Sequence, residues 1–471
     1  MSKRVLAFDF GASSGRAIIG EYADGKITLN EVHRFDNSPV MLGGTYYWDV
    51  LRLFHEIKQG ILAAKAAGGF DTIGIDTWGV DFGLIGKDGR LLENPVHYRD
   101  RRTDGMIDRA DELIAREVLY SHTGIQIIYF NTVYQLLSLK EKRPELLERA
   151  DKVLFMPDLF GYFLTGNMTS EYSIATTSGL VNLKTGDWDK EIFEKLGIDA
   201  GKMCPIAPSG SVLGNLRKEI CDELGVPSVP VISVCGHDTQ SAVTAVPTAG
   251  SDFAFISSGT WSLFGTEIES PITSDAARSF NITNEGGYGY SIAFLKNIAG
   301  LWLIQESRRQ YRREGKEYSY ADLERLALEA EPDKFRIDPD DEIFAPPGDM
   351  PGRIRDYCEK DGQGRPETVG EVIRCIYESL AAKYKYVLGG IENCTGKKFD
   401  KIHVVGGGTK DGLLCRMTAD VCGLPVYAGP VEATVLGNVA VQLLSSGELA
   451  DIAEARKVIA DSFELKQYYP K

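Results

Sequence analysis

Two strand–turn–strand patterns dominate the distribution of hydrophobic and polar positions along the chain. The first runs from Val5 to Gly20, where apolar segments flank the turn Asp9-Phe-Gly-Ala-Ser-Ser-Gly-Arg16. The second runs from Ala254 to Gly265 and again places a Ser-x-Gly turn between apolar segments. Each pattern predicts a β-hairpin whose turn lets backbone N–H groups approach an anion such as phosphate. The repetition predicts an internal duplication with two similar lobes.

Apolar spacing also predicts the main helices and strands between these hairpins. Helices are expected at 48–67, 132–143 and 369–388, with the glycine pairs 68–69 and 389–390 ending the first and the last. Strands are expected at 72–76, 152–156, 229–235 and 401–405. An inserted helical segment at 300–331 has Ser319 and Asp322 as capping residues. The segment 247–251, rich in Pro, Gly and Ser, predicts the lobe boundary, which gives lobes of 1–246 and 247–471.

The composition limits the kinds of molecule that this protein is expected to bind. The 471 residues are 43% hydrophobic, enough for two or three domains. A net charge of −15 argues against nucleic acid or an anionic membrane as the main partner, although turns, helix ends and Mg²⁺ can hold a small phosphorylated ligand. The eight dispersed cysteines lack metal-site spacing, and neither a secretion leader nor an apolar run of bilayer length is visible. We therefore expect a cytoplasmic protein with reduced cysteines, and the sequence leaves its oligomeric state open.

The loop Asp76-Thr-Trp-Gly-Val-Asp81 follows the strand at 72–76. Binding groups gather at this end of strands in open α/β sheets. Carboxylates accept hydrogen bonds from hydroxyls, and an indole packs against the C–H face of a sugar. Trp78 and Asp81 are therefore candidates for binding a polyol. The alternative is a β-hairpin with Trp78 in the core and the acids in solvent.

A second polar cluster, Gly236-His237-Asp238, joins a predicted strand to a predicted helix of small residues. Phosphoryl transfer from ATP to an alcohol needs in-line placement, charge neutralisation by Mg²⁺ and an acceptor for the hydroxyl proton. An aspartate with an ordinary pKa of about 3.9 is ionised at neutral pH and can accept that proton. Asp238 is the candidate base, and a helix N-cap is the alternative. His237 either binds a substrate hydroxyl or packs at the end of the strand.

Two further sequence features concern the binding of a nucleotide. Asp9 either orients Mg²⁺ beside the phosphates or serves only as a turn-forming residue. The glycines 406–408 follow a strand and permit close approach of an adenine or ribose, although such triplets are common in tight turns. The chain has no P-loop motif and no Rossmann glycine spacing, which disfavours those two modes of nucleotide binding.

Taken together, these motifs resemble the FGGY carbohydrate kinases, which belong to the superfamily of actin and hexokinase. The resemblance covers nearly the whole chain, and it is carried by residues 11–16, 74–82, 130–136, 156–158, 237–239, 257–263, 281–287, 295–298, 300–303, 404–408 and 429–433. The hairpins and the glycine triplet are shared across the superfamily and specify only ATP. The loop at 77–81 and the stretch Asn281-Ile-Thr-Asn-Glu-Gly-Gly287 are narrower and are similar to the kinases of L-rhamnulose.

The resemblance implies an α/β fold with two actin/hexokinase-like (ribonuclease H-like) lobes around a central cleft. It implies that ATP and L-rhamnulose give ADP and L-rhamnulose 1-phosphate, a step in rhamnose catabolism, with Asp238 as the proton acceptor. The implied ketose-binding residues besides Asp238 are Gly79, His237, Thr239 and Asn297. The implied nucleotide-binding residues are Ala12, Ser13, Ser14, Gly15, Arg16, Thr260, Gln305 and Gly407. Thr409-Lys410-Asp411 stands where such kinases often have an amide, which leaves the adenosine contacts open.

Two alternatives to this function remain at the level of sequence. The first keeps the reaction and changes the sugar to another ketose, such as L-fuculose or L-xylulose, because hydroxyl stereochemistry is not encoded in a loop motif. The second is an actin-like or chaperone-like ATPase that acts on a protein partner. The loop with Trp78 and Asp81 argues against the second, because an ATPase of that kind has no need of a sugar site.

Overall fold

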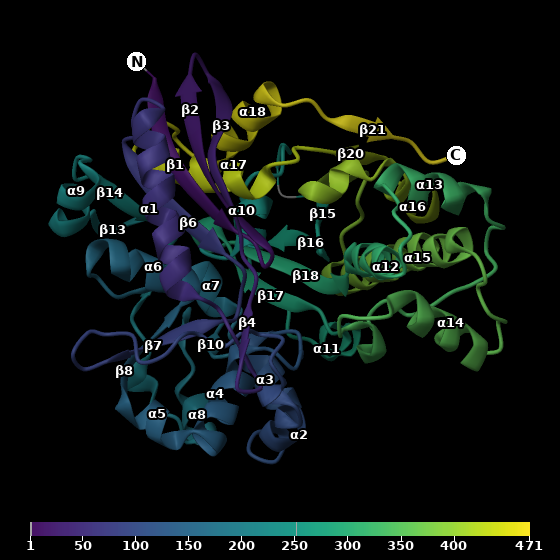
Figure 1. The fold of residues 1–471 in the computed structure, drawn as a ribbon, viewed down its shortest axis with the longest axis horizontal. Helices are drawn as coiled ribbons and strands as arrows, with labels where there is room; N and C mark the ends of the chain where they lie inside the picture. The colour runs from purple at the N-terminus through teal and green to yellow at the C-terminus, as the bar shows by residue number, and fades with distance from the viewer. Residues whose placement is uncertain (1, 251) are drawn as a thin grey trace. The chain divides into compact units, whose positions relative to one another are not determined.

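The computed structural model describes residues 2–250 and 252–471 and divides the chain into two compact units (Figure 1). The first unit comprises Met1–Gly250, Glu267–Phe294 and Ala433–Phe463, and the second comprises Ser251–Thr266, Leu295–Glu432 and Glu464–Lys471. The first break lies a few residues beyond the expected boundary. Two later segments return to the first unit, so neither unit is one continuous stretch of sequence.

A six-stranded sheet forms the centre of the first unit, with the strand order β13-β14-β6-β1-β2-β3. β6 runs parallel to both β1 and β14, whereas the remaining neighbours are antiparallel. The strands are β1 (Lys3–Phe10), β2 (Ser14–Ala23), β3 (Lys26–Asp36), β6 (Thr72–Thr77), β13 (Ser211–Asn215) and β14 (Pro230–Ser233). The three parallel strands therefore end at one edge of the sheet, where binding groups gather in α/β folds.

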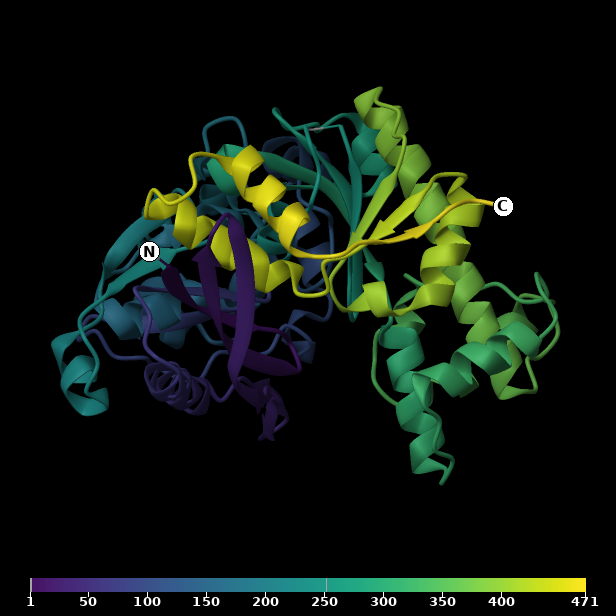
Figure 2. The ribbon, with the colours of Figure 1, turned by 90° about the horizontal axis from the view of Figure 1, so that it is seen from above.

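Helices cover both faces of this sheet. Figure 2 shows the yellow helices on one side of the purple strands. One face carries α1 (Val50–Ala66) and α6 (Met156–Thr165), over a core that includes Leu6, Phe8 and Phe10 of β1. On the other face lie α10 (Asp238–Thr244), α17 (Ala433–Ser445) and α18 (Ile452–Ser462).

Helices α10 and α17 cross closely at Gly437. A Cβ atom there would lie 1.8 Å from the carbonyl oxygen of Ser241, so only glycine permits the crossing. Nearly every residue of α17 is buried, which explains why this late segment belongs to the first unit.

A second hydrophobic core in the first unit is built around α4, whose residues Thr132 to Leu139 are all buried. It lies among helices α2 (Met106–Asp111), α3 (Arg116–Thr123), α4 (Thr132–Lys142), α5 (Pro144–Arg149) and α8 (Lys190–Leu196) and the strand pair β7 (Phe82–Gly86) and β8 (Ala150–Phe155). The remaining elements of the unit are short: β4 (Val40–Leu42), β5 (Thr45–Tyr47), β9 (Ser170–Glu171), α7 (Tyr172–Thr176), β10 (Val181–Asn182), β11 (Asp187–Trp188), β12 (Ile206–Ala207), α9 (Lys218–Leu224), α11 (Asp275–Phe280) and β17 (Thr283–Gly286).

The second unit repeats the topology of the first. Its strands follow one another in the order β18-β16-β15-β19-β20-β21, with β19 parallel to β15 and β20 and with antiparallel pairs β15–β16 and β20–β21. The strands are β15 (Ala254–Ser258), β16 (Trp261–Ile268), β18 (Ile292–Ala299), β19 (Ile402–Val405), β20 (Val426–Ala428) and β21 (Lys466–Tyr468). In each unit a hairpin is flanked by a third strand on one side and two parallel strands on the other. The predicted duplication is therefore confirmed.

The helices of the second unit are α12 (Trp302–Arg313), α13 (Tyr320–Glu329), α14 (Met350–Lys360), α15 (Val369–Thr395) and α16 (Gly412–Cys422). The Ser319–Asp322 capping box at the start of α13 is confirmed. The expected end of a helix at Gly389-Gly390 is wrong, because α15 continues to Thr395 and ends at Gly396. Leu388, Gly390 and Ile391 are buried along it, and this packing outweighs the low helix propensity of glycine.

Two further structural facts concern the class of protein. All eight cysteines are free thiols in the structure. Among residues 2–250 and 252–471, no helix combines the length and the apolar character needed to cross a lipid bilayer.

Candidate active site

Asp9 and Asp76 lie side by side in register at the ends of the parallel strands β1 and β6. Arg16, opposite Asp9 in the hairpin, brings its Nη2 within 2.5 Å of Asp9 Oδ2. Asp76 is completely buried, and its Oδ2 accepts a hydrogen bond of 2.6 Å from the Asn438 amide of α17. Its Oδ1 has no hydrogen-bond partner in the described part of the chain. Burial raises the pKa of Asp76 well above its ordinary value, and the nearby charge of Asp9 adds to the increase.

Asp238 is the first residue of α10, at the end of the turn that follows β14. The predicted helix with an acid in its first turn is confirmed, but His237 occupies the N-cap position and Asp238 does not. The backbone N–H of Thr77 donates to Gly236 O at 2.9 Å, which fixes the turn beside the end of β6. The hydroxyl of Thr239 lies 3.3 Å from Asp238 Oδ1.

The Asp238 side chain remains 31% exposed and is therefore accessible to a substrate. Desolvation raises the pKa of Asp238 to about 6, the charge of Asp9 raises it too, and His237 lowers it. The carboxyl group is therefore ionised at neutral pH and a stronger base than an ordinary aspartate, which suits proton abstraction from an alcohol.

The imidazole of His237 lies between two carboxyl groups. Its Nδ1 is 3.2 Å from Glu285 Oε2, and its Nε2 is 3.5 Å from Asp238 Oδ1. Burial lowers the pKa of His237, but Glu285 and Asp238 outweigh burial, so the net direction is upward. A Cβ atom at Gly79 would lie 3.3 Å from His237 Nε2, so the loop after β6 passes directly by this ring. The structure therefore brings the expected ketose-binding residues Gly79, His237 and Thr239 together around Asp238.

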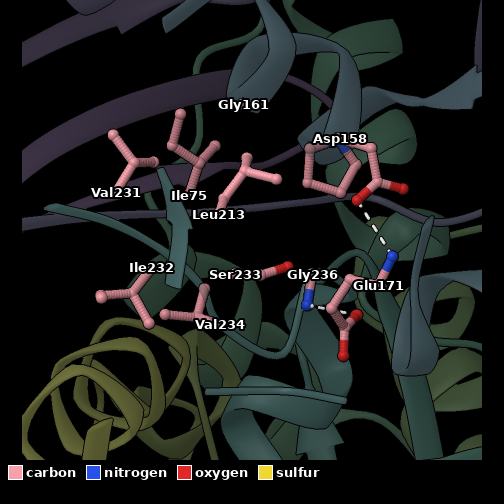
Figure 3. Close-up of a pocket in the computed structure, with 11 residues that line it drawn as sticks. Ile75, Asp158, Gly161, Glu171, Leu213, Val231, Ile232, Ser233, Val234 and Gly236 are labelled. Atoms are coloured by element: carbon pink, nitrogen blue, oxygen red, sulfur yellow. Dashed lines mark hydrogen bonds between the residues drawn. The ribbon is translucent and has the colours of Figure 1, made fainter. Parts of the chain in front are cut away.

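Glu171 fixes the turn Gly236-His237-Asp238 from its buried side (Figure 3). Its Oε2 accepts the backbone N–H of Gly236 at 2.9 Å, and a Cβ atom at Gly236 would lie 3.1 Å from the same oxygen. Ser173, whose hydroxyl donates to Glu171, accepts the backbone N–H of His237 at 3.3 Å. The two residues before Asp238 are therefore held by one buried carboxylate and its serine.

Glu171 lies next to a second buried acid, Asp158, and a cavity of about 10 Å³ lined by both. The backbone N–H of Glu171 donates to Asp158 Oδ1 at 3.0 Å, as Figure 3 shows. Burial raises the pKa of Asp158 well above its ordinary value and also raises the pKa of Glu171. The five hydrogen bonds that Glu171 accepts counter this effect of burial at Glu171.

The loop after β6 holds Trp78 and Asp81 in a buried hydrogen-bonded cluster. Both are buried, and Asp81 Oδ2 accepts hydrogen bonds from the indoles of Trp48 (2.7 Å) and Trp78 (3.0 Å), whose ring centroids are 4.0 Å apart. Asp81 Oδ1 accepts from the Gln135 amide at 3.1 Å. Asp81 is thus neither in solvent nor pointing at an open surface, and it orients the indoles. Direct sugar contact by Trp78 or Asp81 stays a prediction.

Val80, between Gly79 and Asp81, has a backbone φ of 68°, which is rare for a β-branched residue. The Thr132 hydroxyl donates to Val80 O at 2.7 Å, and Val80 N–H donates to the Thr177 hydroxyl at 3.2 Å. These bonds hold a strained backbone next to His237, and strain of this kind concentrates at functional sites.

The first hairpin turn contains the expected phosphate-binding residues Ala12, Ser13, Ser14, Gly15 and Arg16. Its backbone closes through Gly11 N–H to Ser14 O at 2.9 Å. Asn37 holds the turn from outside, because its side-chain amide donates to Gly11 O at 2.8 Å and its backbone N–H to Ser13 O at 3.1 Å. Ser13 remains exposed at the tip.

In the second unit, the structure brings two expected nucleotide-binding residues together. Thr260, in the turn of the second hairpin, lies with its Oγ1 3.4 Å from Gln305 Oε1 of α12. Gly407 is exposed after β19, and Asn297 lies on β18. Asp411 caps α16 and accepts a hydrogen bond from Tyr377, so the departure from the family pattern there has a structural role.

Family models cover almost all of the chain. Residues 4–245 match the N-terminal domain of the FGGY family of carbohydrate kinases, and residues 254–446 match its C-terminal domain. The chain belongs to the FGGY family of carbohydrate kinases. As a kinase of this family, it uses a small sugar and ATP as substrates.

Several relatives of this carbohydrate kinase are similar over nearly their whole length. Rhamnulokinase from Bacteroides thetaiotaomicron is 43% identical over 100% of this chain and 96% of that protein. Rhamnulokinase from Halalkalibacterium halodurans is 44% identical over 98% of this chain and 98% of that protein. Rhamnulokinase from Bacillus subtilis is 41% identical over 99% of this chain and 95% of that protein.

Solved structures of sugar kinases share the fold of this carbohydrate kinase. Xylulose kinase from Lactobacillus acidophilus superposes with a TM-score of 0.82 at 19% identity, over 100% of this chain and 94% of that one. Glycerol kinase from Plasmodium falciparum superposes with a TM-score of 0.78 at 15% identity, also over 100% and 94%. The actin/hexokinase-like α/β fold with two FGGY domains is therefore confirmed.

Four residues of the carbohydrate kinase that shape the site were missed at the level of sequence: Asn37, Glu171, Glu285 and Asn438. Glu285 lies inside the motif at 281–287, so that motif could have indicated Glu285 as a site residue. The other three lie far from Asp9 and Asp238 in sequence and carry no motif of their own. Only folding places their side chains at the site.

The acids of this carbohydrate kinase fit a magnesium ion. Mg²⁺ in phosphoryl-transfer enzymes takes one or two carboxylates, and waters and phosphate oxygens complete its shell. Asp9 acts electrostatically on both Asp76 and Asp238, and the buried Asp76 Oδ1 has no partner in the described residues. No group of three or more His, Cys, Asp or Glu side chains with metal-binding geometry occurs among residues 2–250 and 252–471. The role of Asp9 in holding Mg²⁺ together with ATP stays a prediction.

Proposed function

We propose that this carbohydrate kinase transfers the terminal phosphoryl group of ATP to the 1-hydroxyl of L-rhamnulose. The full-length similarity to several rhamnulokinases supports the choice of sugar. The observation that carries the reaction is the partly exposed Asp238 carboxylate, with its pKa near 6, at the end of a rigidly held turn. The products are ADP and L-rhamnulose 1-phosphate, and a cytoplasmic location, where ATP is available, is part of the proposal.

In the proposed mechanism, Asp238 accepts the proton of the 1-hydroxyl as its oxygen forms a bond to the terminal phosphorus of ATP. The bond between that phosphorus and the bridging oxygen of ADP breaks, and ADP leaves with the electron pair. Asp9 would hold Mg²⁺, which supplies neutralisation of the phosphate charge. Gly79, His237, Thr239 and Asn297 bind the ketose.

Two sets of residues contact the nucleotide in this proposal. Residues 12–16 bind the phosphates through the turn that Asn37 holds. Thr260, Gln305 and Gly407 bind the rest of the nucleotide. Asp81 acts on the sugar indirectly, because it fixes the orientation of the Trp78 indole.

The proposal is tested by measuring ADP release across purified ketoses. We expect the highest kcat/KM with L-rhamnulose, about tenfold or more above L-fuculose and L-xylulose, because a site that hydrogen-bonds sugar hydroxyls discriminates against epimers that leave its polar groups unpaired. Assays without sugar give the background rate of ATP hydrolysis. A higher kcat/KM with another ketose would reassign the substrate within the same kinase family.

A further inference from the structure

We propose that Glu285 is a positioning residue for phosphoryl transfer, which holds the His237 imidazole through Nδ1 so that Nε2 faces the Asp238 carboxylate. The inference rests on the proposed role of Asp238 as the base. It gives a function to the stretch 281–287, whose acid has no part in the mechanism described so far.

The Glu285 side chain is anchored by its own strand. On either side of it in β17, Asn284 N–H donates to Gly124 O at 2.9 Å and Gly286 N–H donates to the Thr176 hydroxyl at 2.8 Å. The Tyr120 hydroxyl donates to Ile282 O at 2.6 Å. Glu285 itself is only 4% exposed. These contacts with α3 and α7 keep its carboxylate at a fixed position beside α10.

The two nitrogens of His237 face different carboxyl groups, which determines the orientation of the ring. Nδ1 lies 3.2 Å from Glu285 Oε2, and Nε2 lies 3.5 Å from Asp238 Oδ1. Gln240, one turn along α10, places its amide nitrogen 3.4 Å from the same Glu285 oxygen. The side chain of Glu285 therefore contacts the start of α10 at two points and fixes it relative to β17.

The two flanking carboxyl groups favour a positively charged imidazolium ring. Nδ1 faces Glu285 as an ion pair and has no hydrogen-bond partner in the described part of the chain. A neutral ring with its proton on Nδ1 would present a lone pair to Asp238 and repel the carboxylate. A doubly protonated ring instead attracts Asp238 and holds its oxygens in one orientation. Glu285 stabilises that positive charge at close range, and Asp238 and the more distant Glu171 act in the same direction.

The first test compares Glu285→Ala and Glu285→Gln with the wild type. We expect Glu285→Ala to lower kcat about 10- to 100-fold and to leave the KM for ATP unchanged, because only the orientation around Asp238 is lost. Glu285→Gln keeps an oxygen that can accept from Nδ1 and should retain more activity than the alanine variant. The matched control is Glu56→Gln, because Glu56 Oε2 lies 2.7 Å from His33 Nε2 in a second Glu–His pair of the same unit.

The second readout is the ¹⁵N NMR spectrum of the His237 ring in each full-length protein. Spectra recorded across a range of pH give the pKa of the ring, and we expect it to be lower in Glu285→Ala than in the wild type, because Glu285 is one of the groups that raise it. Wild-type kcat in Glu285→Ala, or an unchanged spectrum, would overturn the inference even if the melting temperature falls. Full activity of Asp238→Asn would instead refute the proposed base, so the two failures are distinguishable.

Discussion

Replacing Asp238 with asparagine is expected to lower kcat by about 10²- to 10⁴-fold, the usual cost of losing a general base. Asparagine has nearly the same shape and can still interact with Thr239, but it cannot accept the hydroxyl proton. Binding of ATP should persist, because the phosphate turn lies in the β1–β2 hairpin and not in the turn before α10. Steady-state kinetics with L-rhamnulose and calorimetric titration with ATP measure the two quantities separately.

The pH dependence gives a second readout for the same variant. Asp238, with its pKa near 6, loses its function as a base when it is protonated, so wild-type kcat/KM for the sugar should fall as the pH drops below about 6. The residual activity of Asp238→Asn should lack that acidic limb. Asp275→Asn is the matched control, because Asp275 also begins a short helix but is exposed. Near-normal turnover of Asp238→Asn would remove Asp238 from the mechanism.

Replacing Glu171 with alanine is expected to reduce both stability and turnover. The change removes the acceptor of five hydrogen-bond donors, which belong to Ser173, Ile174, Ser209 and Gly236. A buried donor left without a partner costs about 1–3 kcal/mol. Thermal unfolding should therefore show a loss of about 3 kcal/mol or more. Because Gly236 and His237 precede Asp238, kcat should also fall, by about tenfold or more, at temperatures where the variant is folded.

The matched control for Glu171 is Asp189→Ala. Asp189 is also buried and caps a helix, accepting from Ile192 N–H at 3.0 Å, the Asn182 amide at 2.7 Å and His122 Nδ1 at 2.9 Å. It has none of the contacts with the turn at 236–238 that Glu171 makes. We expect Asp189→Ala to lose stability and to keep wild-type kcat. Equal kcat in the Glu171 and Asp189 variants would show that the Glu171 contact with the turn has no catalytic consequence.

Local patterns predicted the parts of the fold that depend on near neighbours. The two hairpins, the helix at 132–142 and the Ser319 capping box all follow from short-range spacing and capping chemistry, and all are present. The helix that continues through Gly389-Gly390 was mispredicted because buried residues around the glycines stabilise it. The return of α17 to the first unit depends on its crossing with α10 at Gly437, which no local pattern encodes.

The candidate site was predictable only in part, for a similar reason. Asp9, His237 and Asp238 stand at the ends of recognisable strands, where chemistry is expected in this class of fold. Asp81 was expected to bind the sugar because it follows such a strand, and that contact stays a prediction. The hydrogen bonds from Trp48 and Trp78 to its carboxylate were not predictable from the loop motif. The contact of Glu285 with His237 joins residues 48 positions apart, and the sequence contains no rule for that pairing.

The most direct measurement is a crystal structure of the protein with L-rhamnulose and a non-hydrolysable ATP analogue bound together. We predict that a carboxylate oxygen of Asp238 lies within about 2.6–3.2 Å of the sugar 1-hydroxyl, the reach of a general base, with the terminal phosphate on the other side of that hydroxyl. A bound sugar whose 1-hydroxyl is out of reach of Asp238, or an Asp238 carboxylate turned away from it, would contradict the account.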